Sequence, residues 1–150
     1  MNKHFCCPQC GNLRGLFPDY CEFCGSLETP FAQTSYIKVD LEKGMPTVEE
    51  AISYFQQYLF RSEELGVRAL LVLHGYGSSG EGGRIRRRFR ELLESNEWAN
   101  RIDEFVYGET AHHLKSLKLS ATLKKELEKE RFSSNPGCTL LLLKHIDLHF

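Results

Sequence analysis

Residues 69–83 read Ala69-Leu70-Leu71-Val72-Leu73-His74-Gly75-Tyr76-Gly77-Ser78-Ser79-Gly80-Glu81-Gly82-Gly83. The five apolar residues that open this stretch predict a strand that is buried on both faces of a sheet. The glycines predict a loop, after which Ile85, Phe89 and Leu93 recur at helical spacing. A buried strand that passes through a loop into an amphipathic helix is typical of an α/β domain.

The segments on either side of this stretch favour the same fold class. Alternating apolar residues predict a strand over 36–41, and Thr47-Val48-Glu49-Glu50 has the pattern of a capping box that starts a helix ended by Gly66. The later elements are expected to be a strand, one or two helices and a last strand, at 102–107, 109–131 and 138–144. Short crossovers through helices favour a mostly parallel or mixed sheet with helices packed against it.

Five of the six cysteines lie within residues 6–24, and four of them form two Cys-x2-Cys pairs that are each followed by glycine. Four thiolates with this spacing can converge on one Zn²⁺ in a tetrahedral site. We therefore predict that residues 1–28 form a zinc ribbon, with the ligands Cys7, Cys10, Cys21 and Cys24. Cys6 could substitute for Cys7, but Cys7 gives both pairs the same spacing. Because the segment is poor in apolar residues, the metal would supply its folding free energy.

Other roles for the cysteines are weighed against zinc. Disulfides are disfavoured because nothing in the sequence indicates an oxidising compartment. A thioredoxin-like redox site is disfavoured because that motif uses one pair at the start of a helix. Iron in a rubredoxin-like site stays open, since the sequence does not select the metal. Cys138 lies in an apolar run and is expected to be a buried core thiol.

Composition limits the classes of function. The chain has 150 residues and a formal net charge of −1, which fits one ordinary domain with a small appendage and argues against a globally basic nucleic-acid binder. No apolar run approaches the ~18 residues of a membrane helix, and the first residues lack the apolar segment of a secretory signal. We therefore expect a cytoplasmic protein without membrane contact, with a linker over 29–35 and an α/β domain over 36–150.

The glycine-rich loop offers backbone N–H groups and the start of a helix to an anion. Its Gly75-x-Gly77-x-x-Gly80 spacing matches a dinucleotide fingerprint by letter. The match is weak, because the loop belongs to the second strand–helix unit and runs on through Gly82-Gly83. The Gly-Lys-Ser/Thr sequence of a P-loop does not occur either, so we expect no nucleotide cofactor.

The helix after the loop is rich in arginine, a residue suited to bidentate phosphate contacts. A solvated helix face, partly neutralised by glutamates, is the alternative for such a run of charge. The position of the helix next to an amide-rich loop favours contact with a phosphodiester backbone. The residues predicted to bind DNA or RNA are Gly75, Gly77, Arg84, Arg87 and Arg88.

Two titratable residues follow neighbouring predicted strands. Asp40 lies at the end of the first strand and His74 at the end of the second. If these strands are adjacent, the two side chains can share a cleft at the edge of the sheet where ligands collect. We expect His74 to be exposed to ligand, with a pKa suited to proton transfer near neutrality. The alternative is a buried histidine that caps the strand. The adjacent His112 and His113 are expected to be surface residues.

Several of these stretches together resemble the Smr (small MutS-related) domain. They are Val39-Asp40-Leu41, Gly44, Thr47–Ala51, Leu71–Gly77, Arg84, Leu92-Leu93 and Asn135–Thr139. The resemblance covers about residues 36–145 and implies a two-layer βα sandwich, like the C-terminal domain of a bacterial translation initiation factor. It also implies nucleic-acid binding and, in several members, an endonuclease activity that nicks DNA or cuts RNA. The family's His-Gly-x-Gly motif matches His74, Gly75 and Gly77.

The family's other motif, Leu-Asp-Leu-His-Gly, is altered in this chain. Asp40 is kept, Glu42 replaces the histidine, and one residue is added before Gly44. Asp-Leu-His does occur at 147–149, but no helix follows it, and we interpret it as a coincidence.

Two main hypotheses follow. In the first, the chain is a nuclease in which His74 is the general acid or base, Asp40 orients it or holds Mg²⁺ or Mn²⁺, and Glu42 replaces the missing histidine. In the second, the same loop and arginines bind nucleic acid without cleavage, and the ribbon adds a second contact or recruits a protein partner. A third possibility is that the ribbon is only a protein-interaction module. The change at Glu42 is the argument against cleavage.

Overall fold

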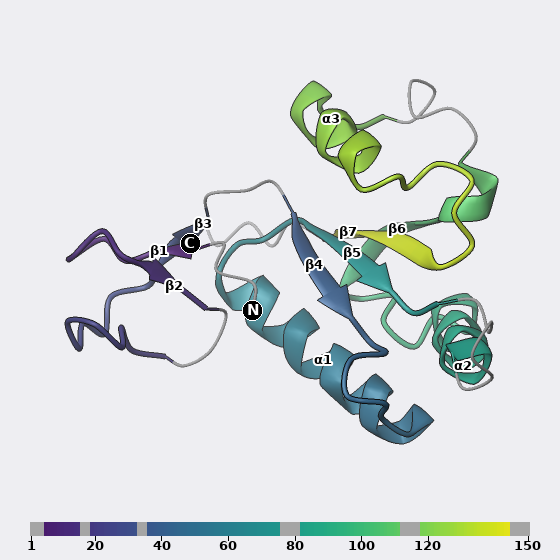
Figure 1. Ribbon diagram of the computed structural model, residues 1–150, viewed down its shortest axis with the longest axis horizontal. Coiled ribbons are helices and arrows are strands. Elements are labelled where there is room, and N and C mark those ends of the chain that lie inside the picture. Colours follow the sequence, from purple (N-terminus) through teal and green to yellow (C-terminus); the bar gives the residue numbers. More distant parts are fainter. Residues whose placement is uncertain (1–4, 16–18, 33–35, 76–81, 112–117, 145–150) are drawn as a thin grey trace.

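Two β-sheets organise the computed structural model of the chain, which describes residues 5–15, 19–32, 36–75, 82–111 and 118–144 (Figure 1). One sheet has three short strands near the N-terminus, and the other has four strands and carries the helices. In chain order the elements are β1 (Phe5–Cys6), β2 (Leu13–Arg14), β3 (Phe31–Ala32), β4 (Ile37–Asp40), α1 (Val48–Glu64), β5 (Ala69–Leu73), α2 (Gly82–Glu94), β6 (Ile102–Tyr107), the 3₁₀-helix η1 (Gly108–Thr110), α3 (Ala121–Lys129) and β7 (Cys138–Leu143).

The small sheet has the order β2-β1-β3, and both of its strand pairs are antiparallel. Strand β3 lies within residues 29–35, the segment expected to be a linker. Its Phe31 is opposite Cys6 of β1. The segment therefore contributes a strand to the N-terminal unit, which differs from the expected connection without structure. A strand of two residues is too short to show the alternation that predicts strands.

The large sheet has the order β4-β5-β7-β6. Strands β4 and β5 are parallel, whereas β7 is antiparallel to both of its neighbours, β5 and β6. The sheet is thus mixed, and its four strands lie within a residue or two of the predicted positions. Strand β5 is covered on both faces, as its continuous apolar run indicates.

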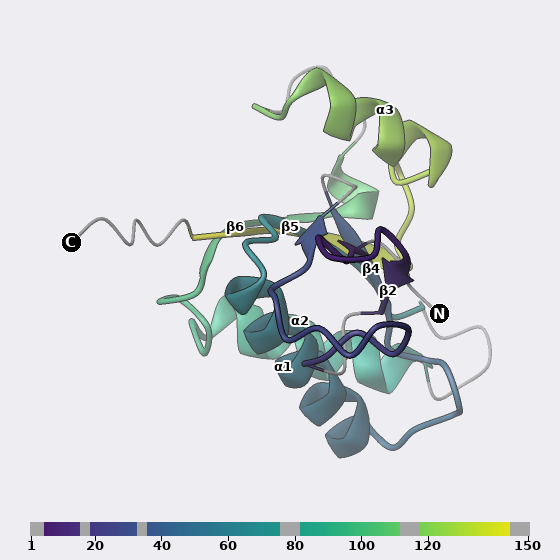
Figure 2. The ribbon, with the colours of Figure 1, turned by 90° about the vertical axis from the view of Figure 1, so that its left-hand side faces the viewer.

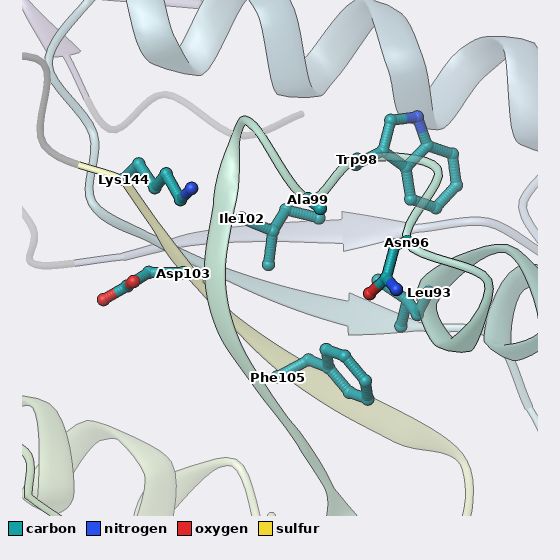
Figure 3. A pocket seen from close by; sticks show the side chains of 8 residues that line it. All are labelled: Leu93, Asn96, Trp98, Ala99, Ile102, Asp103, Phe105 and Lys144. Atoms are coloured by element: carbon teal, nitrogen blue, oxygen red, sulfur yellow. The ribbon is translucent and has the colours of Figure 1, made fainter.

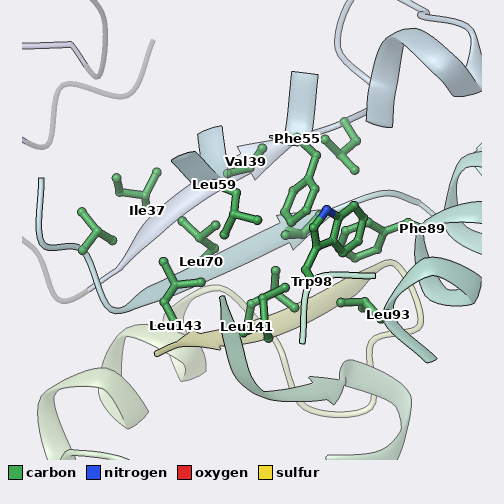
Figure 4. Close-up of a cluster of buried hydrophobic side chains, with 14 of the residues drawn as sticks. Ile37, Val39, Phe55, Leu59, Leu70, Phe89, Leu93, Trp98, Leu141 and Leu143 are labelled. Carbon is green, nitrogen blue, oxygen red and sulfur yellow. The ribbon is translucent and has the colours of Figure 1, made fainter. Parts of the chain in front are cut away.

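Helices α1 and α2 cover one face of this sheet and form the predicted two layers with it (Figure 2). The core between them contains Phe55 of α1, Phe89 of α2 and Trp98, with the Phe55 ring centroid 4.9 Å from that of Phe89 and 4.8 Å from that of Trp98 (Figure 4). The α3 segment packs on the opposite face, where Leu127 and Phe132 are fully buried. Alternate residues of each strand supply these two cores, because successive side chains of a strand point to opposite faces.

The ends of the helices follow from local sequence. The Thr47 hydroxyl accepts a hydrogen bond from the Glu50 amide at 3.2 Å, which is one half of the predicted capping box. The other half differs, because the Glu50 carboxylate accepts from the Thr47 hydroxyl, at 3.0 Å, instead of from its amide. Gly66 ends α1 with φ +74°, as predicted. Within 109–131 the described residues form η1 and α3, and Ser120 caps α3.

The N-terminal unit is packed against the large sheet and α1. Phe5 of β1 has no exposed surface and belongs to the core that α1 and α2 share with the sheet. Arg61 of α1 also forms an ion pair with Asp19 at 2.8 Å. Among the described residues, no helix has the length and apolarity needed to cross a membrane.

Candidate metal centre and nucleic-acid interface

Four cysteine sulfurs converge in the N-terminal unit. The Sγ of Cys7 lies 3.8 Å from that of Cys24, the Sγ of Cys10 lies 3.6 Å from that of Cys21, and all four atoms lie within 4.8 Å of one another. A Zn²⁺ bound to four thiolates at about 2.3 Å would separate the sulfurs by about 3.8 Å. The cluster therefore has the size and the donor set for one tetrahedral metal ion such as zinc.

Each Cys-x2-Cys-Gly segment forms the same tight turn. The Gly11 amide donates to the Cys7 carbonyl at 2.9 Å, and the Gly25 amide donates to the Cys21 carbonyl at 2.8 Å. Both glycines have φ near +75°, in the left-handed region that glycine adopts without strain. The glycine after each pair thus allows the turn that brings its two sulfurs together.

Backbone amides and crowding act in opposite directions on these thiols. The amide of Cys10 lowers the pKa of Cys7, and the amide of Asn12 lowers the pKa of Cys10. The amide of Ser26 also acts to lower the pKa of Cys24, but burial and the neighbouring sulfurs outweigh it and raise that pKa to about 12. Crowded thiols resist simultaneous ionisation unless a cation balances their charge, and a bound metal ion meets this demand.

The two remaining cysteines lie apart from the cluster. The thiol of Cys6 donates to the Gly11 carbonyl at 3.2 Å, so Cys7, and not its neighbour, is directed toward the other sulfurs. Cys138 is buried at the start of β7, as expected for a core thiol, and burial raises its pKa to about 11.

The carboxyl ends of β4 and β5 meet at one edge of the sheet, but Asp40 and His74 leave it on opposite faces. Asp40 is two residues after Lys38 and shares its face of the sheet, where the Lys38 ammonium group forms an ion pair with Glu130 beside α3 at 2.8 Å. His74 is two residues after Val72 and shares the other face, because Val72 lies in the core under α1 and α2. Asp40 is in register with the residue before His74, and an offset of one residue reverses the face. These two side chains therefore do not form the cleft that we expected them to share.

His74 is completely buried, which contradicts the expectation of a ligand-exposed histidine. Its Nδ1 lies 2.8 Å from the Gly75 carbonyl oxygen, its Nε2 lies 2.8 Å from the Thr139 hydroxyl, and its ring packs against Phe89. Burial lowers the pKa of His74 to about 4, and the charge of Arg90 acts in the same direction, against the Gly75 carbonyl. The side chain is neutral near pH 7, as in the alternative of a buried histidine that caps the strand.

Glu42 lies against the first glycine of the loop. Gly75 has φ +72°, and a Cβ added to it would overlap the Glu42 carboxylate. The amide of Glu42 donates to the Asp40 carboxylate at 3.0 Å, which fixes the turn after β4. Burial of the carboxylate, followed by the charge of Asp40, raises the pKa of Glu42. Two carboxylates and the backbone of the glycine-rich loop thus come together at this edge.

The arginines of α2 form two groups. Arg84, Arg87 and Arg88 are exposed, and Arg88 makes a long surface ion pair with Glu91, at 3.4 Å. An exposed pair of this kind contributes little free energy, so it can exchange for a phosphate contact. Within the described residues 82–94, the first turn of α2 contains no acidic side chain that would oppose an anion at the positive end of the helix dipole.

The second group is turned inward. The guanidinium groups of Arg86 and Arg90 both pair with the Glu109 carboxylate, at 3.0 Å and 2.6 Å. Arg90 also stacks on Tyr107, with its Cζ 3.9 Å from the ring centroid. The groove beside this group has a volume of about 400 Å³ and is lined by Gly83, Arg86, Arg87, Arg90, Glu91, Glu94 and Tyr107. Arg86 and Arg90 therefore form contacts within the protein, in contrast to the exposed arginines of the same helix.

A smaller hollow lies at the other end of α2, away from the glycine-rich loop. Its volume is about 240 Å³ (Figure 3). The lining residues are Leu93, Asn96, Trp98, Ala99, Ile102, Asp103, Phe105 and Lys144. Its wall combines apolar side chains with one amide, one acidic and one basic side chain, and no predicted site residue contributes to it.

Some predicted features fall outside the described residues. They are Gly77, His112, His113 and residues 147–149.

Residues 39–115 match the Smr domain. The chain belongs to the Smr-domain family. The crystal structure of the Smr domain of Thermus thermophilus MutS2 is similar to this chain, with 24% sequence identity over 72% of this chain and 98% of that chain and a TM-score of 0.45. A comparison with curated proteins finds no match. The Smr domain is known in nucleic-acid-binding and nicking proteins, so the function of this chain is related to nucleic acids.

The Smr match includes the carboxylate edge, the glycine-rich loop and α2, but it does not include the whole site. The cysteine cluster precedes residue 39, and Thr139, the partner of His74, follows residue 115. Sequence reasoning missed Thr139 because the register that places it beside His74 is set by β5 and β7, which are far apart in the chain. It also missed Glu109, whose charge neutralises two arginines of the helix.

Proposed function

We propose that this Smr-domain protein binds the phosphate backbone of DNA or RNA through the start of α2 and the loop before it. The observation that carries the proposal is the exposed set Arg84, Arg87 and Arg88 at the end of a helix that follows a glycine-rich loop. Guanidinium groups bind phosphate oxygens in a bidentate manner, and the positive end of a helix dipole favours an anion. Gly77 would supply a backbone amide to the same phosphates, whereas the amide of Gly75, which was predicted to do so too, donates to the Gly137 carbonyl at 3.1 Å.

Cleavage of the bound strand is the second part of the proposal. Glu42 is better placed than His74 to act as the general base, because its carboxylate lies at the loop while both ring nitrogens of His74 are engaged in the interior. Asp40 would orient the Glu42 backbone and, with its carboxylate oxygens, offers the type of ligand that Mg²⁺ or Mn²⁺ prefers. Arg84 and the loop amides would stabilise charge on the phosphate. His74 would hold the loop in place.

Binding without cleavage is the alternative function. The observation that favours it is the replacement of the histidine of the family's first motif by Glu42. A carboxylate next to a phosphate is repelled unless a cation or a proton intervenes. Burial and the charge of Asp40 raise the pKa of Glu42, which is the direction that favours such a proton.

We further propose that the cysteine cluster holds Zn²⁺ and that the N-terminal unit contacts a protein partner instead of the phosphate backbone. Within residues 5–32 the charged side chains are three acids, Asp19, Glu22 and Glu28, and one base, Arg14, which is buried. Four thiolates around Zn²⁺ would add further negative charge. A surface of this sign repels phosphates, so it would add no favourable backbone contact to those of α2.

Measured affinity against salt concentration tests the binding proposal. The zinc-loaded protein is titrated with labelled single-stranded RNA, single-stranded DNA and duplex DNA at several salt concentrations. Arg87→Ala is expected to weaken binding and to reduce the slope of log K against log [salt] by about 0.7 to 0.9, the equivalent of one phosphate contact. Lys125→Ala, which removes an exposed charge from α3, is the matched control and should change neither quantity. An affinity that is independent of salt would contradict the proposal.

A cleavage assay then separates the two functions. Supercoiled plasmid, branched DNA and single-stranded RNA are incubated with the protein and Mg²⁺ or Mn²⁺, in parallel with Glu42→Gln. Cutting by the original protein that is lost in the variant, while binding persists, would support the nuclease. Binding without cutting by either protein would establish the chain as a nucleic-acid-binding module.

A further inference from the structure

A continuous chain of buried polar contacts runs from η1 to the first residue of the glycine-rich loop. It connects Glu109 to Arg90, Arg90 to Thr139, Thr139 to His74, and His74 to the carbonyl of Gly75. Thr139 and His74 have no exposed surface, and Arg90 is 9% exposed. Buried polar groups usually have hydrogen-bond partners, and both ring nitrogens of His74 and the hydroxyl of Thr139 find theirs within this series of contacts.

We propose that Thr139 is a positioning residue: held by Arg90 and Glu109, it donates to Nε2 of His74, holds the ring in place and thereby fixes the backbone from which the glycine-rich loop starts. The assignment of the tautomer follows from the contacts alone. Its importance for nucleic-acid binding rests on the proposed function.

The direction of each hydrogen bond follows from the chemistry of its acceptor. The Gly75 carbonyl can only accept, so the proton of the neutral imidazole is on Nδ1, which donates to it. Nε2 then carries a lone pair and accepts from the Thr139 hydroxyl. With its proton used in this way, the Thr139 oxygen is an acceptor for the Arg90 guanidinium, at 3.4 Å. In each hydrogen bond of this series the donor is on the Arg90 side and the acceptor is on the Gly75 side.

Arg90 is fixed on the other side by charge and stacking. Its guanidinium pairs with Glu109 at 2.6 Å, lies over the ring of Tyr107, and also donates to the carbonyl of Cys138 at 3.4 Å. A buried guanidinium needs a carboxylate partner, because an uncompensated buried charge is strongly unfavourable. The position of the donor to Thr139 is therefore determined by groups on three elements, β6, η1 and β7.

The backbone of the loop start is held by the same part of β7. The amides of His74 and Gly75 both donate to the Gly137 carbonyl, at 3.0 Å and 3.1 Å. With the side-chain bond to Thr139, three contacts thus bind residues 74 and 75 to residues 137–139. Gly75 leaves these contacts with φ +72°, which sets the direction in which the loop departs. A change at Thr139 would act on the loop without contact to any nucleic acid.

A packing role for Thr139 is the alternative, and substitution by valine separates the two. Valine keeps the shape of the side chain but removes the hydroxyl, so a pure packing role predicts little change. The positioning role predicts that Nε2 of His74 loses its donor, and that the ring is then held through its Nδ1 contact with the Gly75 carbonyl alone. Thr139→Ser keeps the hydroxyl and is expected to restore the original behaviour.

The test uses ¹⁵N-labelled full-length protein and long-range ¹H–¹⁵N correlation spectra of the histidine rings, assigned with His74→Gln. The original protein should show His74 as the Nδ1–H tautomer and as neutral from pH 5.5 to 8, with Arg86, Arg90 and Glu109 as the charged side chains that act on it. Thr139→Val should keep the proton on Nδ1 but shift the Nε2 resonance, because the Nε2 lone pair has lost its donor, and Thr139→Ser should keep the original Nε2 resonance. An Nε2–H tautomer in the original protein would overturn the proposal without any variant.

Nucleic-acid affinity is measured on the same three proteins. Thr139→Val should bind about fivefold more weakly, the equivalent of one lost hydrogen bond, with an unchanged salt slope because no phosphate contact is removed. Equal Nε2 resonances and equal affinities of Thr139→Val and the original protein would refute the positioning role. If none of the three proteins binds nucleic acid, the proposed function fails, whereas the spectra still decide the tautomer.

Discussion

The carboxylate of Glu42 occupies the space that a side chain at Gly75 would need. These two residues belong to the two motifs by which the chain resembles the Smr family, and the structure brings them into direct contact. In that family a histidine stands where this chain has Glu42. The contact therefore shows that the changed motif still reaches the glycine-rich loop, although with an acid in place of an imidazole.

Substitution of Gly75 tests this contact. We expect Gly75→Ala to destabilise the protein for two reasons, the left-handed φ of +72° and the overlap with Glu42. The first effect alone costs about 1 kcal/mol, and the second adds to it by displacing the carboxylate. Urea unfolding followed by circular dichroism measures the free energy of unfolding.

Gly44 offers a matched control for this prediction. It has φ +82°, but nothing lies within 4 Å of a Cβ built on it. Gly44→Ala should therefore show the backbone effect without the overlap. In the double variant Glu42→Ala/Gly75→Ala, the part of the stability loss that the overlap causes should be recovered. Equal losses for the two single glycine variants would show that Glu42 does not hold the position described.

Protonation of Glu42 gives a second prediction. Because its pKa is raised in the folded state, the native protein binds this proton more tightly than the unfolded chain, and the charged carboxylate lowers stability as the pH rises through that range. Glu42→Gln is therefore expected to raise the free energy of unfolding at pH 7 and to lose this advantage in acid. A pH series of urea unfolding curves compares the two proteins. A variant that is less stable at pH 7 would contradict the shift.

His74 gives a prediction of opposite sign. Its pKa falls from 6.5 to about 4 on folding, so between these values the unfolded chain binds a proton that the native protein does not. Its contribution to stability is complete above pH 6.5 and declines by up to about 3 kcal/mol as the pH falls to 4. In His74→Gln this decline should be missing, so the stability difference between the two proteins shrinks in acid. A difference that is constant with pH would show that His74 is not buried in its neutral form.

Metal removal is expected to affect the whole chain. Cys10→Ser should lose the bound metal, measured as one zinc per chain by mass spectrometry, and should lower the melting temperature of the α/β domain. The reason is that Phe5, between the ribbon strands and the main core, is fully buried. Cys6→Ser is the control, because its thiol donates to Gly11 and not to the cluster. Retention of zinc by Cys10→Ser, or its loss in Cys6→Ser, would contradict the ligand set.

Local patterns predicted the parts of the structure that depend on nearby residues. The apolar run of β5, the cap at Thr47 and the two cysteine turns each arise from a few consecutive residues. The burial of His74 could not be predicted in this way, because it depends on Thr139, which is 65 residues away. The faces of Asp40 and His74 depend on a register difference of one residue between two strands. Such a difference is fixed only when the sheet forms.

The charge on α2 shows the same limit. Five arginines in seven residues indicate a basic helix, yet Arg86 and Arg90 are neutralised by Glu109 from η1. A short 3₁₀-helix has no sequence pattern that would place this glutamate. The predicted nucleic-acid-binding arginines, Arg84, Arg87 and Arg88, are the ones that the structure leaves exposed.

Strand β7 occupies an inner position of the large sheet, between β5 and β6, although it is formed by residues 138–143. During synthesis the ribosome must therefore deliver residue 143 before β6 has a partner, while the cysteine turns are complete once residue 25 has emerged. The nascent chain can complete its cysteine turns early, whereas β6 lacks its partner strand until β7 has followed it. A pause in translation before residue 138 would lengthen this vulnerable interval and increase the demand for chaperones.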